Sequence, residues 1–313
     1  MNFAIIGVGG YIAPRHLRAI RDTGHTTVAA YDPKDSVGIL DQYGFDIRFF
    51  TEFERFDRHL EKLRRGDPAQ RVHYVTICSP NYLHDAHCRA ALRVGADAIC
   101  EKPLVINPWN LDALSEIEAE TGRTINTILQ LRVHPKLIEL RERLLIERQN
   151  QRYDVDLTYI TARGDWYHRS WKGDEQKSGG IATNIGIHFF DLLLWLFGSL
   201  VECRVYHVDQ KRMSGFLELE FARVRWFLSV DKDDLPFEPQ VGSKTTFRSI
   251  TINGQEVEFS EGFTDLHTRV YERTLAGDGF RIPDIRPATE LTYTIRHTPI
   301  ASLDTLTHPL LRR

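Results

Sequence analysis

The segment "NFAIIGVGGYIAP", residues 2–14, decides the fold class of this chain. It begins with a short, mostly apolar run, which is typical of a buried strand. Gly7, Gly9 and Gly10 follow at once, and a helix is expected over residues 13–24. Glycines between a strand and a helix allow a tight turn and a close approach to the backbone. The segment therefore predicts the first strand–turn–helix unit of a parallel α/β domain.

The next hundred residues repeat this alternation of strand and helix patterns. Apolar, β-branched runs predict strands at 26–32, 72–80, 97–103 and 126–132. Helices are expected over 81–95 and 107–122, with Asn81 and Asn107 as N-caps and Gly95 and Gly122 as stops. Strands joined by crossover helices pair in parallel, so these residues predict a parallel sheet.

After about residue 150 the chain changes to β-rich segments that follow one another directly. They lie at 153–164, 202–210, 215–222, 224–232, 244–254 and 255–261. Turn signals at 213–215 and 253–254 separate some of them, and one amphipathic helix is expected over 184–198. We therefore expect an α/β fold: an N-terminal Rossmann-type parallel-sheet domain, residues 1–125, followed by an α+β domain with an open, mostly antiparallel sheet, residues 126–313.

Composition excludes several classes of partner. The chain of 313 residues is 42% hydrophobic and 27% charged with a formal net charge of −3, which gives no support for nucleic-acid or membrane-surface binding. Its longest apolar run, residues 189–197, is too short to span a bilayer, and no signal peptide is seen, so we expect a cytoplasmic protein. The four cysteines fit no zinc or disulfide spacing; we expect reduced thiols and no metal.

The glycine turn has the features of a dinucleotide site. Gly7 permits the tight turn, Gly9 lets the backbone approach a pyrophosphate, and the helix N-terminus attracts its charge. Asp32 ends the second strand, where a carboxylate accepts ribose hydroxyls and repels a 2′-phosphate, which favours NAD. A purely structural glycine turn is the alternative. The expected cofactor contacts are Gly7, Gly9, Gly10, Tyr11, Ile12 and Asp32, with Ser79, Asn81 and His84 after the strand at 72–80.

Glu101, Lys102 and Pro103 follow a core strand directly. Burying either charge is costly unless it is paired or used, so a solvated strand end is the simplest alternative. At the carboxyl end of a parallel strand, however, both residues face the ligand crevice. We expect Glu101 and Lys102 to contact the cofactor and Lys102 to donate to a substrate oxygen. Pro103 restricts the backbone of this turn, and a cis Lys102–Pro103 peptide bond is one way in which it can do so.

The helix at 184–198 carries Asn184, His188 and Asp191 at i, i+4 and i+7, on one helical face. A histidine there can accept the proton of a hydroxyl as hydride leaves the same carbon; a core histidine is the alternative. Residues 163–177 before it are dense in aromatic and basic side chains, which suit a ring and an anionic substrate. An aromatic loop packed between domains is the other interpretation.

The glycine-rich start, Glu-Lys-Pro and "SGGIATNIGIHFFD", residues 178–191, together resemble the glucose–fructose oxidoreductase / inositol dehydrogenase / rhizopine-catabolism family. The resemblance covers the full chain. The family usually has three glycines and an Asp where this chain has Ser178 and Asn184, while His188 and Asp191 match. The resemblance implies an NAD-dependent dehydrogenase with Lys102 and His188 as catalytic residues.

The stretch "RGDWYHRSWKGD", residues 163–174, with "GYIAPRHL", residues 10–17, is similar to the branch that oxidises UDP-N-acetylglucosaminuronate. That branch forms the 3-keto sugar for bacterial surface polysaccharides such as O-antigen, and 2-oxoglutarate recycles the cofactor in some members. The resemblance implies a cofactor contact from Trp166. The implied substrate contacts are Lys102, Arg163, Tyr167, Lys177, Ser178, Asn184 and His188.

Two other functions stay open from the sequence. A dehydrogenase of a free sugar, inositol or dihydrodiol would keep the fold without needing the basic loop. A non-catalytic NAD-binding regulator would be expected to lack Lys102 or His188, and both are present. The β-rich run at 201–259 also predicts an oligomer, a dimer or a tetramer, because an open sheet usually buries one face against a partner.

Overall fold

The chain folds into two compact units in the computed structural model, which describes residues 1–147, 152–238, 245–257, 259 and 265–312. Unit 1 comprises Met1–Val133 and Thr264–Arg286; unit 2 comprises His134–Phe263 and Pro287–Arg313. The domain boundary expected at residue 125 assigns residues 265–286 to the second domain, whereas these residues belong to unit 1. An amphipathic helix pattern shows that a face is buried but does not show which core buries it.

Unit 1 is built on a parallel sheet, as the sequence predicts. Within the described residues its strands follow the order β3-β2-β1-β4-β5-β6, with every pair parallel. The strands are β1 (Asn2–Ile6), β2 (Thr26–Tyr31), β3 (Arg48–Phe50), β4 (Tyr74–Ile77), β5 (Asp97–Cys100) and β6 (Ile125–Thr127). This is the doubly wound order that places ligands outside the carboxyl ends of the central strands.

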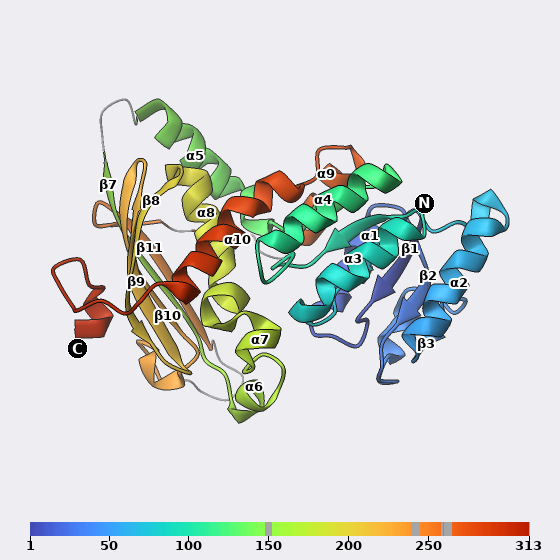
Figure 1. The fold of residues 1–313 in the computed structure, drawn as a ribbon, viewed down its shortest axis with the longest axis horizontal. Helices are drawn as coiled ribbons and strands as arrows, with labels where there is room; N and C mark the ends of the chain where they lie inside the picture. Colours follow the sequence, from blue (N-terminus) through green and yellow to red (C-terminus); the bar gives the residue numbers. More distant parts are fainter. Residues whose placement is uncertain (148–151, 239–244, 258, 260–264, 313) are drawn as a thin grey trace. The chain divides into compact units, whose positions relative to one another are not determined.

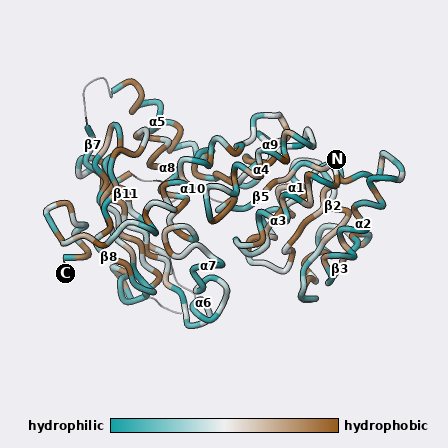
Figure 2. The backbone as a smooth tube through the Cα atoms, in the orientation of Figure 1, coloured by the Kyte–Doolittle hydropathy of each residue, from teal (hydrophilic) through white to brown (hydrophobic). Residues whose placement is uncertain are grey.

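The helices of unit 1 are α1 (Ala13–Asp22), α2 (Phe53–Arg65), α3 (His84–Arg93), α4 (Trp109–Thr121) and α9 (Leu266–Leu275). Helix α10 (Ile282–His297) begins in unit 1 and continues in unit 2. The helix α9, drawn in orange, packs against α1 (Figure 1). Strand β1 is almost entirely buried, and the hydropathy colouring shows the apolar central strands beside the hydrophilic α2 (Figure 2).

Unit 2 is built on a mixed, mostly antiparallel sheet with the order β12-β11-β7-β10-β9-β8 among the described residues. The strands β7 and β10 pair in parallel, and the other neighbours are antiparallel. The strands are β7 (Tyr153–Thr161), β8 (Leu200–Val208), β9 (Arg212–Leu219), β10 (Ala222–Ser229), β11 (Thr246–Ile252) and β12 (Gln255–Glu256). Residues 258, 260 and 261 of the segment expected at 255–261 lie outside the described residues.

Two turn predictions in unit 2 have different outcomes. Asn253 and Gly254 form a turn with φ of +50° and +79°, which these residue types tolerate best. The turn expected at 213–215 is wrong, because these residues lie inside β9. The chain reverses just before them, where the Asp209 carboxylate accepts hydrogen bonds from the backbone N–H groups of Lys211 and Arg212.

The helices of unit 2 are α5 (Pro135–Glu147), α6 (Asp165–Arg169), α7 (Glu175–Ser178) and α8 (Ile187–Phe197). Helix α8 packs on the sheet, where Phe190 meets Trp226 edge-on with ring centroids 5.4 Å apart. The stretch Glu175–Phe197 is long and apolar enough to cross a membrane by length and composition alone. Most of its apolar window, 72%, is buried within the protein, as in the core helix of a globular domain.

We expect Gly215→Ala to destabilise unit 2. A Cβ at Gly215 would lie 2.2 Å from the carbonyl oxygen of Arg204 and 2.6 Å from the buried ring of Trp226. Overpacking of this kind costs about 1–3 kcal/mol. Urea unfolding should show the loss, while Gly38→Ala, whose Cβ would meet nothing within 4 Å, should change stability by less than about 0.5 kcal/mol. Equal midpoints for both variants would contradict this account of the sheet.

Candidate functional site

The glycine turn after β1 is pressed against the end of β4. Gly7 has φ +83°, and a Cβ there would lie 2.7 Å from the backbone of Cys78 and of Ser79. Farther along the turn, Gly9 is exposed and Tyr11 is 91% exposed. The turn thus presents accessible backbone at the start of α1, which is the arrangement that a pyrophosphate requires.

Asp32 is held beside this turn. Its side chain is buried, and its Oδ2 accepts a hydrogen bond from the N–H of Gly9 at 2.9 Å. Its Oδ1 accepts from the N–H of Lys34 at 3.0 Å. The structure therefore brings together the two sequence motifs predicted to bind one dinucleotide, and the fixed carboxylate suits ribose hydroxyls.

The turn after β4 is organised by two buried histidines. Burial lowers the pKa of His87 to about 4, so its neutral ring bonds the Ser79 hydroxyl through Nδ1 at 2.8 Å. His84 places Nε2 2.8 Å from the carbonyl oxygen of Ser79 and Nδ1 2.7 Å from that of Pro103. His84 therefore ties the turn after β4 to the turn after β5, and we assign it a supporting role.

The expected N-caps of two helices are wrong in detail. Asn81 is buried at the start of a 3₁₀ turn, Asn81–Leu83, and α3 begins only at His84. Helix α4 begins at Trp109, with Pro108 as its flanking residue in place of Asn107. A sequence pattern does not predict helix ends closely enough to show the 3₁₀ turn before α3 or the shift of the α4 cap by one residue.

The turn after β5 holds a buried carboxylate beside a half-buried lysine. Glu101 is buried, Lys102 is partly exposed, and the Lys102–Pro103 peptide bond is cis. Glu101 Oε1 lies 3.0 Å from Nε2 of His16 and 3.1 Å from Nε2 of His267. Burial alone would raise the pKa of Glu101, but these two hydrogen bonds hold it well below its usual range. Glu101 is therefore ionised and supports the turn from within.

The same three side chains form a set that could hold a metal ion. The ligand atoms of His16, Glu101 and His267 lie within 4.8 Å of one another, and all three residues are buried. These three residues have no recognisable metal-ligand spacing in the sequence, because His267 is supplied by the distant helix α9. The four cysteines are free thiols, and burial raises the pKa of Cys78 and Cys100 well above the usual value, so neither is an activated nucleophile.

In unit 2, Asn184 and His188 are partly exposed polar residues of a mostly buried segment. Within residues 181–193, all of which the structure describes, every residue is buried except these two. Asp191, expected on the same face, is buried. The simple i, i+4, i+7 face is altered because residues 182–186 form a π turn before α8. Such turns are common at functional sites, and an alternating apolar sequence does not reveal them.

Tyr167 lies beside Asn184. The Asn184 Nδ2 donates a hydrogen bond to the Tyr167 hydroxyl at 2.8 Å. Burial raises the pKa of Tyr167, against the opposing effects of Asn184 and Arg163, so the phenol keeps its proton at neutral pH. Because its oxygen already accepts from Asn184, this hydroxyl can donate its proton to another acceptor.

The other residues predicted to bind substrate differ in their placement. Arg163 and Trp166 are exposed, Trp166 by 56%. Lys177 is exposed and pairs with Asp174 at 3.3 Å. Ser178 is buried, with its hydroxyl donating to the carbonyl oxygen of Asp174. Ser178 thus closes the short helix α7.

Both halves of the chain match models of one protein family. The model of the oxidoreductase family with an NAD-binding Rossmann fold matches residues 1–128. The model of the C-terminal α/β domain of the same family matches residues 151–300. The chain belongs to the Gfo/Idh/MocA oxidoreductase family. It is an oxidoreductase with a Rossmann domain for NAD.

Solved structures of this family include two that are similar to the whole chain. The WlbA (WbpB) dehydrogenase of Thermus thermophilus in complex with NAD and UDP-GlcNAcA is 50% identical, with a TM-score of 0.93 and 99% of each chain covered. The same enzyme in complex with NAD and α-ketoglutarate is 51% identical, again with a TM-score of 0.93 and 99% of each chain covered.

Similarity to curated relatives is more limited. The putative oxidoreductase YteT of Bacillus subtilis is 27% identical over 127 residues, which is 40% of this chain and 30% of that protein. The chain therefore matches less than a third of the length of that family member.

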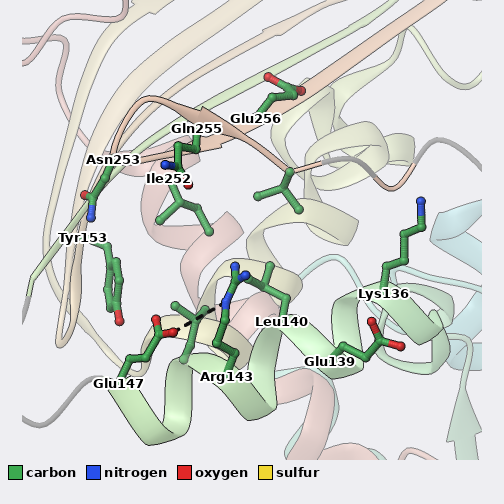
Figure 3. A pocket seen from close by; sticks show the side chains of 12 residues that line it. Lys136, Glu139, Leu140, Arg143, Glu147, Tyr153, Ile252, Asn253, Gln255 and Glu256 are labelled. Carbon is green, nitrogen blue, oxygen red and sulfur yellow. Dashed lines mark ion pairs between the residues drawn. The ribbon is translucent and has the colours of Figure 1, made fainter.

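A cavity of about 710 Å³ lies elsewhere in unit 2, between α5 and the β11–β12 hairpin (Figure 3). It is lined mainly by charged and polar side chains, including the ion pair Arg143–Glu147 at 3.9 Å. None of the residues that the sequence assigned to cofactor or substrate lines it.

We expect the protein to bind NAD at least about tenfold more tightly than NADP, because the Asp32 carboxylate would face a 2′-phosphate. Asp32→Asn keeps the side-chain shape and removes the charge. It should therefore reduce the difference in affinity between NAD and NADP, mainly by improving NADP binding. Titration of both cofactors by protein fluorescence measures this. Equal affinities in the unmodified protein would refute the role of Asp32.

Proposed function

We propose that this protein oxidises the C3 hydroxyl of UDP-N-acetylglucosaminuronate to the 3-keto sugar, with NAD as hydride acceptor. The observation that carries the proposal is 50% identity over 99% of the chain to an enzyme crystallised with NAD and UDP-GlcNAcA. In the balanced reaction the C3–H bond breaks as hydride, the hydroxyl loses its proton, and ketone, NADH and H⁺ are formed. NAD, when bound, supplies the hydride-accepting nicotinamide ring.

Residues of unit 1 fit the cofactor. The exposed Gly9, which has no side chain to obstruct a pyrophosphate, and the fixed carboxylate of Asp32 suit the pyrophosphate and ribose of NAD. Lys102 stands at the carboxyl end of β5, where a ligand of a doubly wound sheet binds. We propose that its ammonium donates a hydrogen bond to the C3 oxygen and stabilises the alkoxide-like charge that develops there.

Residues of unit 2 fit a proton acceptor and an anionic sugar. His188 is partly exposed on a buried helix, and we propose that its imidazole accepts the hydroxyl proton. Asn184 is a neutral amide and cannot act as a base, so we assign it, with Tyr167, to hydrogen bonding of the substrate. The exposed cations Arg163 and Lys177 suit the carboxylate and diphosphate of the substrate.

The proposal includes a second substrate and a cellular place. Because the similar Thermus enzyme was also crystallised with NAD and α-ketoglutarate, we propose 2-oxoglutarate as the compound that reoxidises NADH. A sugar nucleotide, a soluble cofactor and a mostly buried apolar helix are consistent with a cytoplasmic enzyme in surface-polysaccharide synthesis. A homo-dimer or homo-tetramer remains our expectation from the open sheet of unit 2.

His188→Ala and Lys102→Ala should each lower turnover of UDP-N-acetylglucosaminuronate by about 10²–10⁴-fold, because each removes a group that acts on the reacting hydroxyl. Both variants should still bind NAD. The measurements are single-turnover formation of NADH and mass detection of the 3-keto product. His207→Ala on β8 and Lys62→Ala on α2 serve as matched controls and should retain full activity.

Near-normal turnover by His188→Ala at saturating substrate would refute the assignment of the base. Oxidation of myo-inositol or free glucuronate, with none of the sugar nucleotide, would instead support the free-sugar alternative.

A further inference from the structure

We propose that two buried histidines, His16 and His267, fix the carboxylate of Glu101 and thereby position Lys102 for the reaction. This inference rests on the proposed function, because it takes Lys102 as the group that contacts substrate. All of these residues belong to unit 1, and His267 reaches it on α9, after the chain has completed most of unit 2.

The contacts converge on one carboxylate. Glu101 Oε1 takes both histidines, at 3.0 Å from His16 Nε2 and 3.1 Å from His267 Nε2. Its other oxygen, Oε2, accepts the backbone N–H of Lys102 at 3.2 Å. The orientation of the Glu101 side chain therefore affects the position of the Lys102 backbone, to which the lysine side chain is attached.

The protons of this network can be assigned from its chemistry. An ionised carboxylate only accepts, so both Nε2 atoms donate to Glu101. Burial lowers the pKa of His16, which is therefore neutral, and its Nδ1 must accept. The Tyr271 hydroxyl, 2.8 Å from that nitrogen, donates to it and accepts in turn from the Thr76 hydroxyl at 2.8 Å. From Thr76 on β4 to the Glu101 carboxylate, every hydrogen bond in this series therefore has one donor and one acceptor.

The lysine is also held from its other side. The carbonyl oxygen of Pro103 lies 2.7 Å from Nδ1 of the buried His84, and that of Ser79 lies 2.8 Å from its Nε2. Burial lowers the pKa of His84, so the neutral ring donates its single N–H to one of these two carbonyls and contacts the other. The residues on both sides of Lys102 are thus anchored by buried imidazoles, while its own side chain is partly exposed. Such an arrangement fixes where the ammonium emerges and leaves it accessible.

A bound cation is the competing interpretation of the same three side chains. We favour the hydrogen-bond network because both nitrogens lie at hydrogen-bond distance from one oxygen and the second oxygen is engaged by a backbone N–H. A metal would also need both Nε2 atoms unprotonated, which would remove both donors to the carboxylate.

The test compares His267→Leu with His267→Gln. Leucine fills the space without a donor, whereas the glutamine amide can place an N–H where Nε2 of the histidine lies. We expect kcat with UDP-N-acetylglucosaminuronate to fall about 10- to 100-fold in the leucine variant, with KM for NAD changed less than about threefold, and to recover in the glutamine variant. His59→Leu on α2 is the matched control and should keep full activity.

Competitive amine labelling of Lys102, read by mass spectrometry with and without NAD, separates this inference from the proposed function. The labelling rate of Lys102 should change in His267→Leu and return in His267→Gln, whether or not the sugar nucleotide is a substrate. An unchanged rate in the leucine variant would overturn the inference. Loss of folding stability in the leucine variant, without recovery of kcat in the glutamine variant, would also overturn it. A stoichiometric divalent metal ion whose removal by a chelator reproduces the effect of His267→Leu would overturn it as well.

Discussion

The buried carboxylate of Glu101 is the constraint on which unit 1 depends most. An ionised group in a protein interior is tolerated only when donors replace its water, and here His16, His267 and the N–H of Lys102 do so. These donors come from α1, from α9 and from the turn itself. The Glu101 carboxylate, which follows a core strand, thus connects helix α1 and helix α9 to the backbone of Lys102.

This constraint also explains why the return of α9 to unit 1 matters. Without residues 265–286, His267 and Tyr271 would be missing, and Glu101 and His16 would lose partners in a buried environment. Removing one partner of a buried charge generally costs more than the intact pair contributes. The segment therefore completes the polar core under the carboxyl end of β5, besides covering an apolar face.

Local chemistry made the strands of unit 1 predictable from sequence. Apolar runs ending in Gly, Asp, Ser-Pro or Glu-Lys-Pro located β1, β2, β4 and β5, and the placement of the glycine turn beside Asp32 was expected from their positions after β1 and β2. Some features that the sequence missed depend on contacts between distant residues, and others are short local elements. The pairing of His267 with Glu101, the parallel contact of β7 with β10 and the π turn at Asn184 have no local signal. The strand β3 was missed as well, because a run of three residues at the edge of a sheet is too short to show a strand pattern.

The chemistry of unit 2 rests on accessibility within an apolar helix. The helix α8 and its preceding turn bury nearly everything they carry, yet leave Asn184 and His188 partly open. Asn184 carries no charge, so it does not repel an anionic substrate as a carboxylate at this position would. Its side-chain N–H donates to the Tyr167 oxygen, so the Tyr167 hydroxyl can donate its own proton to another group. These features suit a carboxylated sugar nucleotide better than a neutral polyol.

Transfer of the substrate hydrogen is the most direct measurement of the central claim. UDP-N-acetylglucosaminuronate deuterated at C3 would be incubated with excess protein and NAD for a single turnover, and the cofactor extracted after denaturation would be weighed by mass spectrometry. The account predicts NADH heavier by one deuterium together with an unlabelled 3-keto sugar. Unlabelled cofactor, or a sugar that keeps its deuterium, would contradict it.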